Sequence, residues 1–341
     1  MSDVTRRGFL GAAAAGFGAL VAAPVLGACA STPGDTQLTV AYSTLPNLNL
    51  APDFLARDRG LFTEQHLQTT MNPARNSPTS LQQLVGGHAS VARISALTLL
   101  HSVADQNAPI IGVGVDYQQS VFQVTSLSSR PINSLAELNG KTIGFQNLGG
   151  GAEEAFDALL KIGGVAKSAV KRLTAGSGPA AVAFLQDHRA DAILTVFDQE
   201  LAIRHAGTSL NTFNMSGPNP LFGEVFVVLR STLEKHPEKI KRFLAALYTG
   251  YSRLIDEKTR DQSLAALSPS DIDSLKDPTV AKEAMALIAK SWTASGAANV
   301  MRFVPDRWDS AIAALVTNGV VTKAPKASTL YTNELLPRTG S

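Results

Sequence analysis

Short apolar stretches alternate with amphipathic ones along most of the chain, and this spacing favours strands followed by helices. Pro52 suits the first turn of a helix that Gly60 closes. The pattern predicts strands over residues 38–42, 67–71, 91–94 and 110–115, with helices over 53–60, 81–85 and 96–104. Strands and helices that alternate in this way are typical of a mostly parallel sheet covered by helices.

The same alternation begins again after Pro131. It predicts strands over 141–145, 170–173 and 190–196, with helices over 136–138, 152–162 and 178–186. The run 225–229 is a strand that would return to the first sheet, and the rest is largely helical, over 237–255 and 306–318. We therefore expect an α/β fold of two lobes, each a mostly parallel sheet flanked by helices. Residues 38–122 would form lobe 1, 123–225 lobe 2, and 226–341 the return to lobe 1 with C-terminal helices.

The first residues have the features of an export signal. Arg6 and Arg7 precede an apolar, Ala/Gly-rich run over 11–23, as in twin-arginine signals, and small residues then lead to Cys29, as in the lipobox of bacterial lipoproteins. We expect residues 1–28 to be a signal peptide, Cys29 to carry lipid, and 29–37 to be a flexible tether. The alternative is a short membrane-spanning anchor.

Composition narrows the function classes. The 30 basic and 28 acidic residues nearly balance, and no basic stripe suits nucleic acid. The six histidines show no metal-ligand spacing, and no nucleophile is paired with a base. The single cysteine excludes an intramolecular disulfide. We expect no metal, no cofactor and no enzymatic activity.

Ligands of open α/β sheets bind outside the carboxyl ends of the strands, and this rule selects the candidate site residues. Gly149, Gly150 and Gly151 precede a predicted helix, where free amides attract anions, although Glu153 and Glu154 also fit a plain turn with a complemented helix dipole. The candidates for ligand binding are Ser43, Thr44, Asn47, Arg75, Arg93, Asp116, Tyr117, Gly149, Gly150, Gly151, Phe197, Asp198 and Glu224.

Two chemistries remain open for that site. Arg75 and Arg93 would clamp a sulfonate or carboxylate if they faced the cleft, and would otherwise be solvated surface residues. Asp116 beside Tyr117, and Asp198 beside Phe197, suit a flat ligand that carries amino groups. The structural alternative for Asp198 is helix capping.

Four segments carry a family resemblance: 54–62 (FLARDRGLF), 132–144 (INSLAELNGKTIG), 189–192 (RADA), and Trp308 with 332–335 (TNEL). Together they resemble the substrate-binding proteins for nitrate, sulfonates and thiamine-pyrimidine precursors. The segment 84–90 departs from the family pattern because it lacks the usual acid. The resemblance implies a type II periplasmic-binding-protein clamshell. We expect its lobes to hinge about the crossing segments near Gln123 and Phe226.

The resemblance also implies a receptor outside the cytoplasmic membrane that delivers its solute to the permease and ATPase of an ABC importer. Lipid on Cys29 would anchor it to the membrane, and we expect it to be a monomer. The acidic and aromatic candidates favour a thiamine pyrimidine precursor or a related N-heterocycle, with an organosulfonate or a nitrate-type anion as the alternative. A pyrimidine-synthase-like enzyme and a ligand-presenting sensor subunit are alternatives of other classes. The enzyme depends on a cysteine-rich motif, which a chain with one cysteine lacks.

Overall fold

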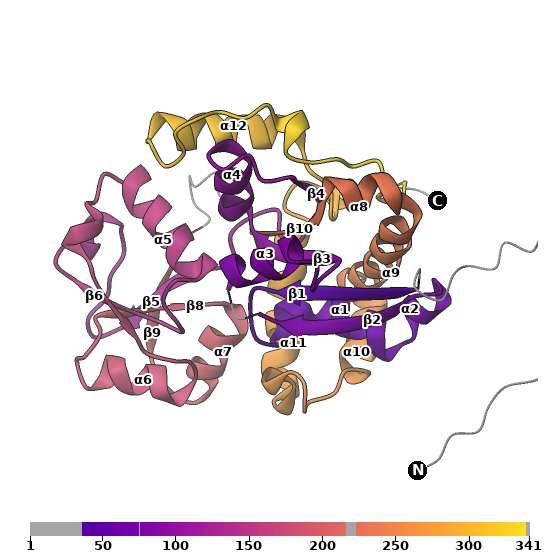
Figure 1. Ribbon diagram of the computed structural model, residues 1–341. Helices are drawn as coiled ribbons and strands as arrows, with labels where there is room; N and C mark the ends of the chain where they lie inside the picture. Colours follow the sequence, from indigo (N-terminus) through magenta and orange to yellow (C-terminus); the bar gives the residue numbers. More distant parts are fainter. Residues whose placement is uncertain (1–35, 75, 216–222, 339–341) are drawn as a thin grey trace, which may run out of the picture. The chain divides into compact units, whose positions relative to one another are not determined.

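The computed structural model describes residues 36–74, 76–215 and 223–338, which contain two five-stranded sheets (Figure 1). The predicted export signal, Cys29 and Arg75 lie outside the described residues. The two-lobed α/β fold expected from the sequence is confirmed.

The first sheet has the order β2-β1-β3-β10-β4. Its strands are β1 (Gln37–Tyr42), β2 (Gln68–Pro73), β3 (Val91–Ser95), β4 (Ile110–Val115) and β10 (Glu224–Leu229). β1 pairs in parallel with β2 and β3, whereas β10 is antiparallel to both of its neighbours. The run 225–229 thus returns to the first sheet, as the sequence predicts.

The second sheet has the order β7-β6-β8-β5-β9. Its strands are β5 (Gln123–Leu127), β6 (Thr142–Phe145), β7 (Lys171–Thr174), β8 (Ala192–Thr195) and β9 (Leu210–Asn214). β6 is parallel to β7 and β8, and β5 is antiparallel to β8 and β9. Each sheet therefore inserts one reversed strand, β10 or β5, next to a parallel core.

Helices cover both sheets (Figure 1). The first lobe carries α1 (Ala51–Asp58), α2 (Leu61–Glu64), α3 (Ser77–Val85), α4 (Ala96–Ala104), α8 (Arg230–Lys235), α9 (Pro237–Ile255), α10 (Glu257–Ala265), α11 (Pro278–Trp292) and α12 (Pro305–Thr317). The second lobe carries α5 (Gly151–Ile162), α6 (Pro179–Gln186) and α7 (Phe197–His205). Short 3₁₀ turns are η2 (Leu48–Leu50), η3 (Ala136–Leu138), η4 (Lys167–Ala169), η5 (Asp273–Lys276), η6 (Ala297–Asn299) and η7 (Ala327–Thr329).

Side-chain caps fix where the helices beside the cleft begin. The Asn76 Oδ1 atom accepts from the Thr79 amide at 2.8 Å and starts α3, and the Ser95 Oγ atom accepts from the Thr98 amide at 3.0 Å and starts α4. Each cap satisfies an amide that the first turn leaves unpaired. Because β3 ends at the Ser95 cap, strand and helix share one residue at the edge of the sheet.

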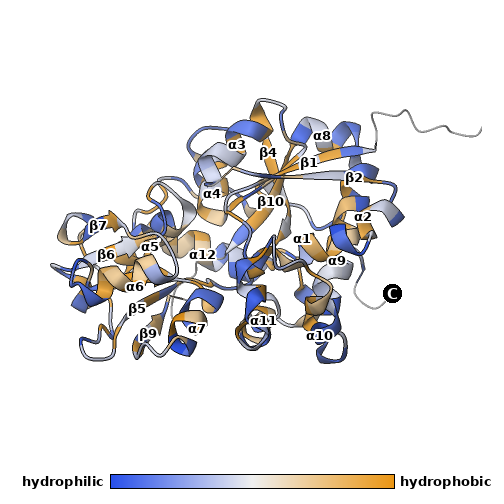
Figure 2. Cartoon of the chain, turned by 90° about the horizontal axis from the view of Figure 1, so that it is seen from below, coloured by the Kyte–Doolittle hydropathy of each residue, from blue (hydrophilic) through white to orange (hydrophobic). Residues whose placement is uncertain are grey.

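The buried apolar residues lie between the sheets and their helices, and Figure 2 shows β1, β4 and β10 in apolar colours against hydrophilic stretches on α8 and α10. Phe226 of β10 meets Phe243 of α9 edge to face, with ring centroids 6.0 Å apart. Within the described residues, no helix combines the length and apolarity needed to cross a membrane.

One glycine sets how closely α9 approaches α1. A Cβ atom added at Gly250 would lie 2.5 Å from the Pro52 carbonyl oxygen, inside van der Waals contact with backbone. Glycine in a helix interior ordinarily costs about 1 kcal/mol relative to alanine, so its presence here reflects the contact.

We therefore expect Gly250→Ala to lower the free energy of unfolding by about 1–3 kcal/mol, because overpacking outweighs the gain in helix propensity. Urea denaturation checks this. Ser252→Ala, at an exposed position of the same helix, is the matched control. A more stable Gly250→Ala protein would contradict the close packing of α9 on α1.

Candidate functional site

A cavity of about 400 Å³ lies where the carboxyl ends of strands from both sheets meet. The first lobe contributes the loop after β1 and residues of β3, and the second lobe contributes the loops after β6, β7 and β8. Its volume falls within the range of about 300–1,000 Å³ that is usual for small-molecule sites. The strand-end rule used on the sequence therefore locates this cavity.

Arg93 forms the floor of the cavity and is fully buried. Its guanidinium bonds to the Asp116 carboxylate, and its Nε atom lies 3.0 Å from the Glu224 carboxylate. The Tyr117 hydroxyl accepts from Nη2 at 3.2 Å. Burial by itself lowers the pKa of Arg93, but the charge of Glu224 opposes this and the pKa rises above its ordinary value. Arg93 stays charged and is already paired.

Asp116 lies beneath the cavity and does not line it. Arg93 donates to one of its oxygens, and the Tyr251 hydroxyl donates to the other. Burial raises the pKa of Tyr251 well above its usual range, so this hydroxyl remains a donor. Asp116 thus serves as the counter-charge of Arg93.

Glu224 is the acid of the cavity wall. Its side chain is 17% exposed, and one of its oxygens accepts from the Ser43 hydroxyl while the other faces Arg93. Two carboxylates, Asp116 and Glu224, therefore oppose one guanidinium. The floor has an excess of negative charge, which disfavours an anionic ligand.

Asp53 extends this buried network below Arg93. The Tyr42 hydroxyl donates to its Oδ1 atom at 2.7 Å. Burial raises the pKa of Asp53 to about 6, against the opposing charge of Arg93 and the hydrogen bond from Tyr42.

The lip of the first lobe is formed by the loop after β1. Asn47 caps η2 through its Oδ1 atom, which accepts from the Asn49 amide at 2.9 Å. The Asn47 Nδ2 atom donates to the Thr44 hydroxyl at 3.2 Å and to the Leu45 carbonyl at 2.9 Å. Ser43, Thr44 and Asn47 all line the cavity, as the sequence predicts, and the cap holds the loop in place.

The glycine run lies on the second lobe at the start of α5. Gly150 and Gly151 line the cavity, and a Cβ atom at Gly151 would meet Ser95 of the first lobe at 3.3 Å. The Gly149 amide donates to the Glu153 carboxylate at 2.7 Å, and its φ of +76° suits glycine. Glu153 therefore occupies an amide that the sequence assigned to a ligand.

Phe197 and Asp198 start α7 but turn away from the cavity. Phe197 is buried in the apolar core of the first lobe. The Asp198 Oδ2 atom accepts from the Ser274 hydroxyl at 2.6 Å, and burial raises the pKa of this carboxyl. Both side chains fasten α7 to the neighbouring α11 and η5. Their neighbours Val196 and Gln199 line the cavity instead.

The sequence reasoning missed several polar and aromatic lining residues. They are Asn49, Ser120, Phe122, Gln146, Asn147, Ser177, Thr195 and Gln199. Gln146 and Asn147 directly follow β6, and Thr195 ends β8, so the strand-end rule could have found them. Phe122 precedes a strand that the sequence pattern did not predict, so the rule could not select it.

Gly223 precedes Glu224 and packs against Tyr117. A Cβ atom there would lie 2.4 Å from the Tyr117 ring. Only glycine therefore fits at position 223 while Tyr117 keeps its place in the cavity wall.

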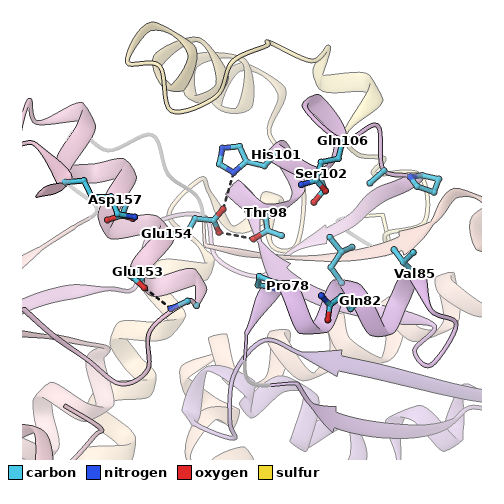
Figure 3. Close-up of a pocket in the computed structure, with 16 residues that line it drawn as sticks. Pro78, Gln82, Val85, Thr98, His101, Ser102, Gln106, Glu153, Glu154 and Asp157 are labelled. Carbon is cyan, nitrogen blue, oxygen red and sulfur yellow. Dashed lines mark hydrogen bonds and ion pairs between the residues drawn. The ribbon is translucent and has the colours of Figure 1, made fainter. Parts of the chain in front are cut away.

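A second, more open groove of about 890 Å³ runs between α3 and α4 of the first lobe and α5 of the second (Figure 3). It shares Gly150 with the cavity but does not lie at the strand ends. Although it is larger, we take the smaller cavity, to which both sheets contribute, as the candidate ligand site. No group of three or more His, Cys, Asp or Glu side chains within the described residues is arranged to hold a metal ion.

The two sheets and the cavity between their strand ends define the fold of the periplasmic binding proteins, and solved structures agree. The alkanesulfonate-binding protein SsuA from Xanthomonas axonopodis pv. citri, bound to MOPS, superposes with a TM-score of 0.65 at 18% identity over 87% of this chain and 98% of its own. The nitrate-binding protein NrtA from Synechocystis PCC 6803 gives 0.61 at 11% identity, over 88% of this chain and 87% of its own.

The chain belongs to the NMT1/THI5-like family, whose model matches residues 47–259. A curated relative, the riboflavin-binding protein RibY of Chloroflexus aurantiacus, is 24% identical over 223 residues. That match covers 63% of this chain and 61% of RibY.

Arg93→Ala should lower the free energy of unfolding by about 3–5 kcal/mol, because it leaves buried carboxylates without their counter-charge. Urea denaturation measures this. Arg57→Ala is the control, since Arg57 also pairs with two acids but is 37% exposed, and its loss should cost less than about 1 kcal/mol. Equal losses for the two variants would show that Arg93 is not a required counter-charge.

The carboxyl group of Asp53 should make the free energy of unfolding decrease as the pH rises. Its folded pKa of about 6 exceeds the unfolded value, so the folded state holds the proton more tightly and loses this advantage between about pH 4 and pH 6. The stability of Asp53→Asn relative to wild type should therefore increase by about 2–3 kcal/mol over that interval. Denaturation at several pH values tests this, with Asp58→Asn on the same helix as control. A pH-independent difference would contradict the buried carboxyl.

Proposed function

We propose that the chain is the solute-binding receptor of an ABC importer. It would be exported, held to the membrane by lipid on Cys29, and would deliver its solute to a permease and an ATPase. Membership in the NMT1/THI5-like family and the periplasmic-binding-protein fold support this class. The cavity between two sheets provides the site that such a receptor needs.

The proposed solute is an uncharged or weakly basic N-heterocycle, with a thiamine pyrimidine precursor favoured. The observation that carries this is the charge of the floor: Arg93 faces two carboxylates, Asp116 and Glu224, which disfavour an anion even though the buried Arg93 Nη1 atom has no hydrogen-bond partner among the described residues. Amide and hydroxyl side chains such as Gln146 and Thr195 line the rest, among apolar walls. Such groups read the N–H and C=O edges of a flat ring.

Two aromatic side chains suit the faces of that ring. Tyr117 in the first lobe and Phe122 in the connection to the second both line the cavity. Flat ligands bury large apolar faces against such rings, while carboxylate and amide groups accept from their edges. Glu224 is placed to accept an N–H group. The heterocyclic ligand in the name of the curated relative RibY accords with this chemistry.

A sulfonate or nitrate-type anion is the second candidate. The sulfonate-binding and nitrate-binding proteins share the fold, and Gly150 and Gly151 place the start of α5 in the cavity wall. A helix N-terminus favours anions. The excess of carboxylates on the floor opposes such a ligand, and we rank it second for that reason.

Thermal unfolding in the presence of candidate solutes tests the proposal. An aminopyrimidine thiamine precursor or riboflavin should raise the melting temperature by about 5 °C or more at roughly 100 times its Kd, because ligand binds only the folded state. Taurine, alkanesulfonates and nitrate should leave it unchanged. A shift with a sulfonate alone would reverse the ranking.

Titration calorimetry of two glutamine variants then locates the site. Gln199→Ala in the cavity wall should weaken binding of the active heterocycle about tenfold, the equivalent of losing one well-made hydrogen bond. Gln186→Ala, at an exposed position of the same lobe, should not. Equal affinities for both variants would place the solute elsewhere.

A further inference from the structure

A carboxylate of the second lobe is held by hydroxyl groups of the first. Glu154, in the first turn of α5, accepts through one oxygen from the Ser95 hydroxyl at 2.6 Å. The same oxygen accepts from the Thr98 hydroxyl at 2.9 Å (Figure 3). Ser95 and Thr98 form the first turn of α4, so a negative charge there also complements the dipole of that helix. These bonds exist only while the lobes are together.

His101, one turn further along α4, adds an ion pair to the same carboxylate. Its Nδ1 atom lies 3.3 Å from the Glu154 Oε1 atom, and its Nε2 atom lies 3.1 Å from the Val320 carbonyl. Both ring nitrogens thus face acceptors. A neutral imidazole can donate to only one of them, whereas the imidazolium donates to both.

We infer that Glu154 is a positioning residue that holds the two lobes in their closed arrangement, and that protonation of His101 strengthens this hold. In this interlobe clasp (Glu154 with Ser95, Thr98 and His101), Glu154, Thr98 and His101 line the groove of Figure 3, whereas Ser95 lines the neighbouring solute cavity. The inference rests on the proposed function only in assuming that the lobes open and close.

Glu153, the acidic residue next to Glu154, has its partners within the second lobe. Glu153 is one residue away on the same helix, but its carboxylate accepts from the Gly149 amide and lies 3.4 Å from the Arg172 Nε atom. Both of these partners belong to the second lobe. Loss of Glu153 therefore leaves every interlobe bond of Glu154 intact.

Other charged groups surround the clasp. On α5 and the turn after it, Asp157 pairs with Lys167 and Arg172, and the Lys161 ammonium donates to the Gly319 carbonyl beside Val320. On the side of α4, Asp105 accepts from the Thr322 hydroxyl at 2.6 Å. Glu154, whose oxygen lies 3.3 Å from the His101 ring, raises the pKa of His101 most, and the charge of Asp105 raises it further.

The direction of the pH effect follows from the geometry. The hydrogen bond to Glu154 raises the pKa of His101 in the closed arrangement, with burial opposing it. A group whose pKa is higher in the closed arrangement than in the open one stabilises the closed arrangement at pH values below its open-state pKa. This stabilisation is lost as the pH rises through its closed-state pKa. Closure should therefore be stronger at pH 5.5 than at pH 8.5.

Pulsed electron paramagnetic resonance on the solute-free full chain tests this. Spin labels on Lys171→Cys in the second lobe and Lys235→Cys in the first, both exposed positions, in a Cys29→Ser background, report the distance between the lobes. The closed fraction relative to the open one should increase about two- to fivefold from pH 8.5 to pH 5.5, the range for a partly exposed ion pair. Glu154→Ala should lower it about tenfold, through loss of its hydrogen bonds.

Two control variants separate the clasp from general effects. Glu153→Ala removes the same charge from the same helix turn and should leave the closed fraction unchanged. His101→Gln should abolish the pH dependence, which excludes Asp53 as its source. The inference is overturned if Glu153→Ala and Glu154→Ala behave alike, or if His101→Gln keeps the pH dependence. Because no solute is present, failure of the clasp is independent of the solute-binding proposal.

Discussion

The buried guanidinium of Arg93 is the interaction on which the architecture depends. It extends from β3 to the Asp116 carboxylate after β4 and the Glu224 carboxylate at the start of β10. These are the strands that meet at the centre and edge of the first sheet. β10 is the strand by which the chain returns from the second lobe to the first sheet. The ion pair between Arg93 and Glu224 therefore joins this strand to the floor of the cavity. Loss of one partner from a buried ion pair leaves the other charge buried without compensation, so the strands and the charges depend on one another.

Much of the fold was predictable because its central strands are buried on both faces. The helix at 96–104 and the strand at 110–115 follow the predicted limits, since apolar residues fill them and a serine cap or proline marks their ends. β5 and β9 were missed. Each carries threonine and asparagine or glutamine in a five-residue run, and pairing with the other supplies the stability that composition does not indicate.

The candidate site agrees with the sequence prediction in position but only in part by residue. The strand-end rule places Ser43, Arg93 and Tyr117 in the cavity wall or floor. It cannot tell whether an arginine faces a ligand or a buried acid, because this depends on partners from distant strands. For the same reason the sequence alone does not distinguish Asp116 from Asp198. Asp116 is the counter-charge of Arg93, whereas Asp198 bonds to Ser274 and holds α7 in place. Side-chain direction at a strand end is a tertiary property.

The contact between Gly223 and Tyr117 joins the wall of the cavity to the residue that leads into β10. A methyl group at position 223 would meet the Cβ atom and the ring of Tyr117, whose hydroxyl also bonds to Arg93. The absence of a side chain at this one position thus keeps both the cavity wall and the buried charges beneath it in register, although position 223 belongs to neither sheet.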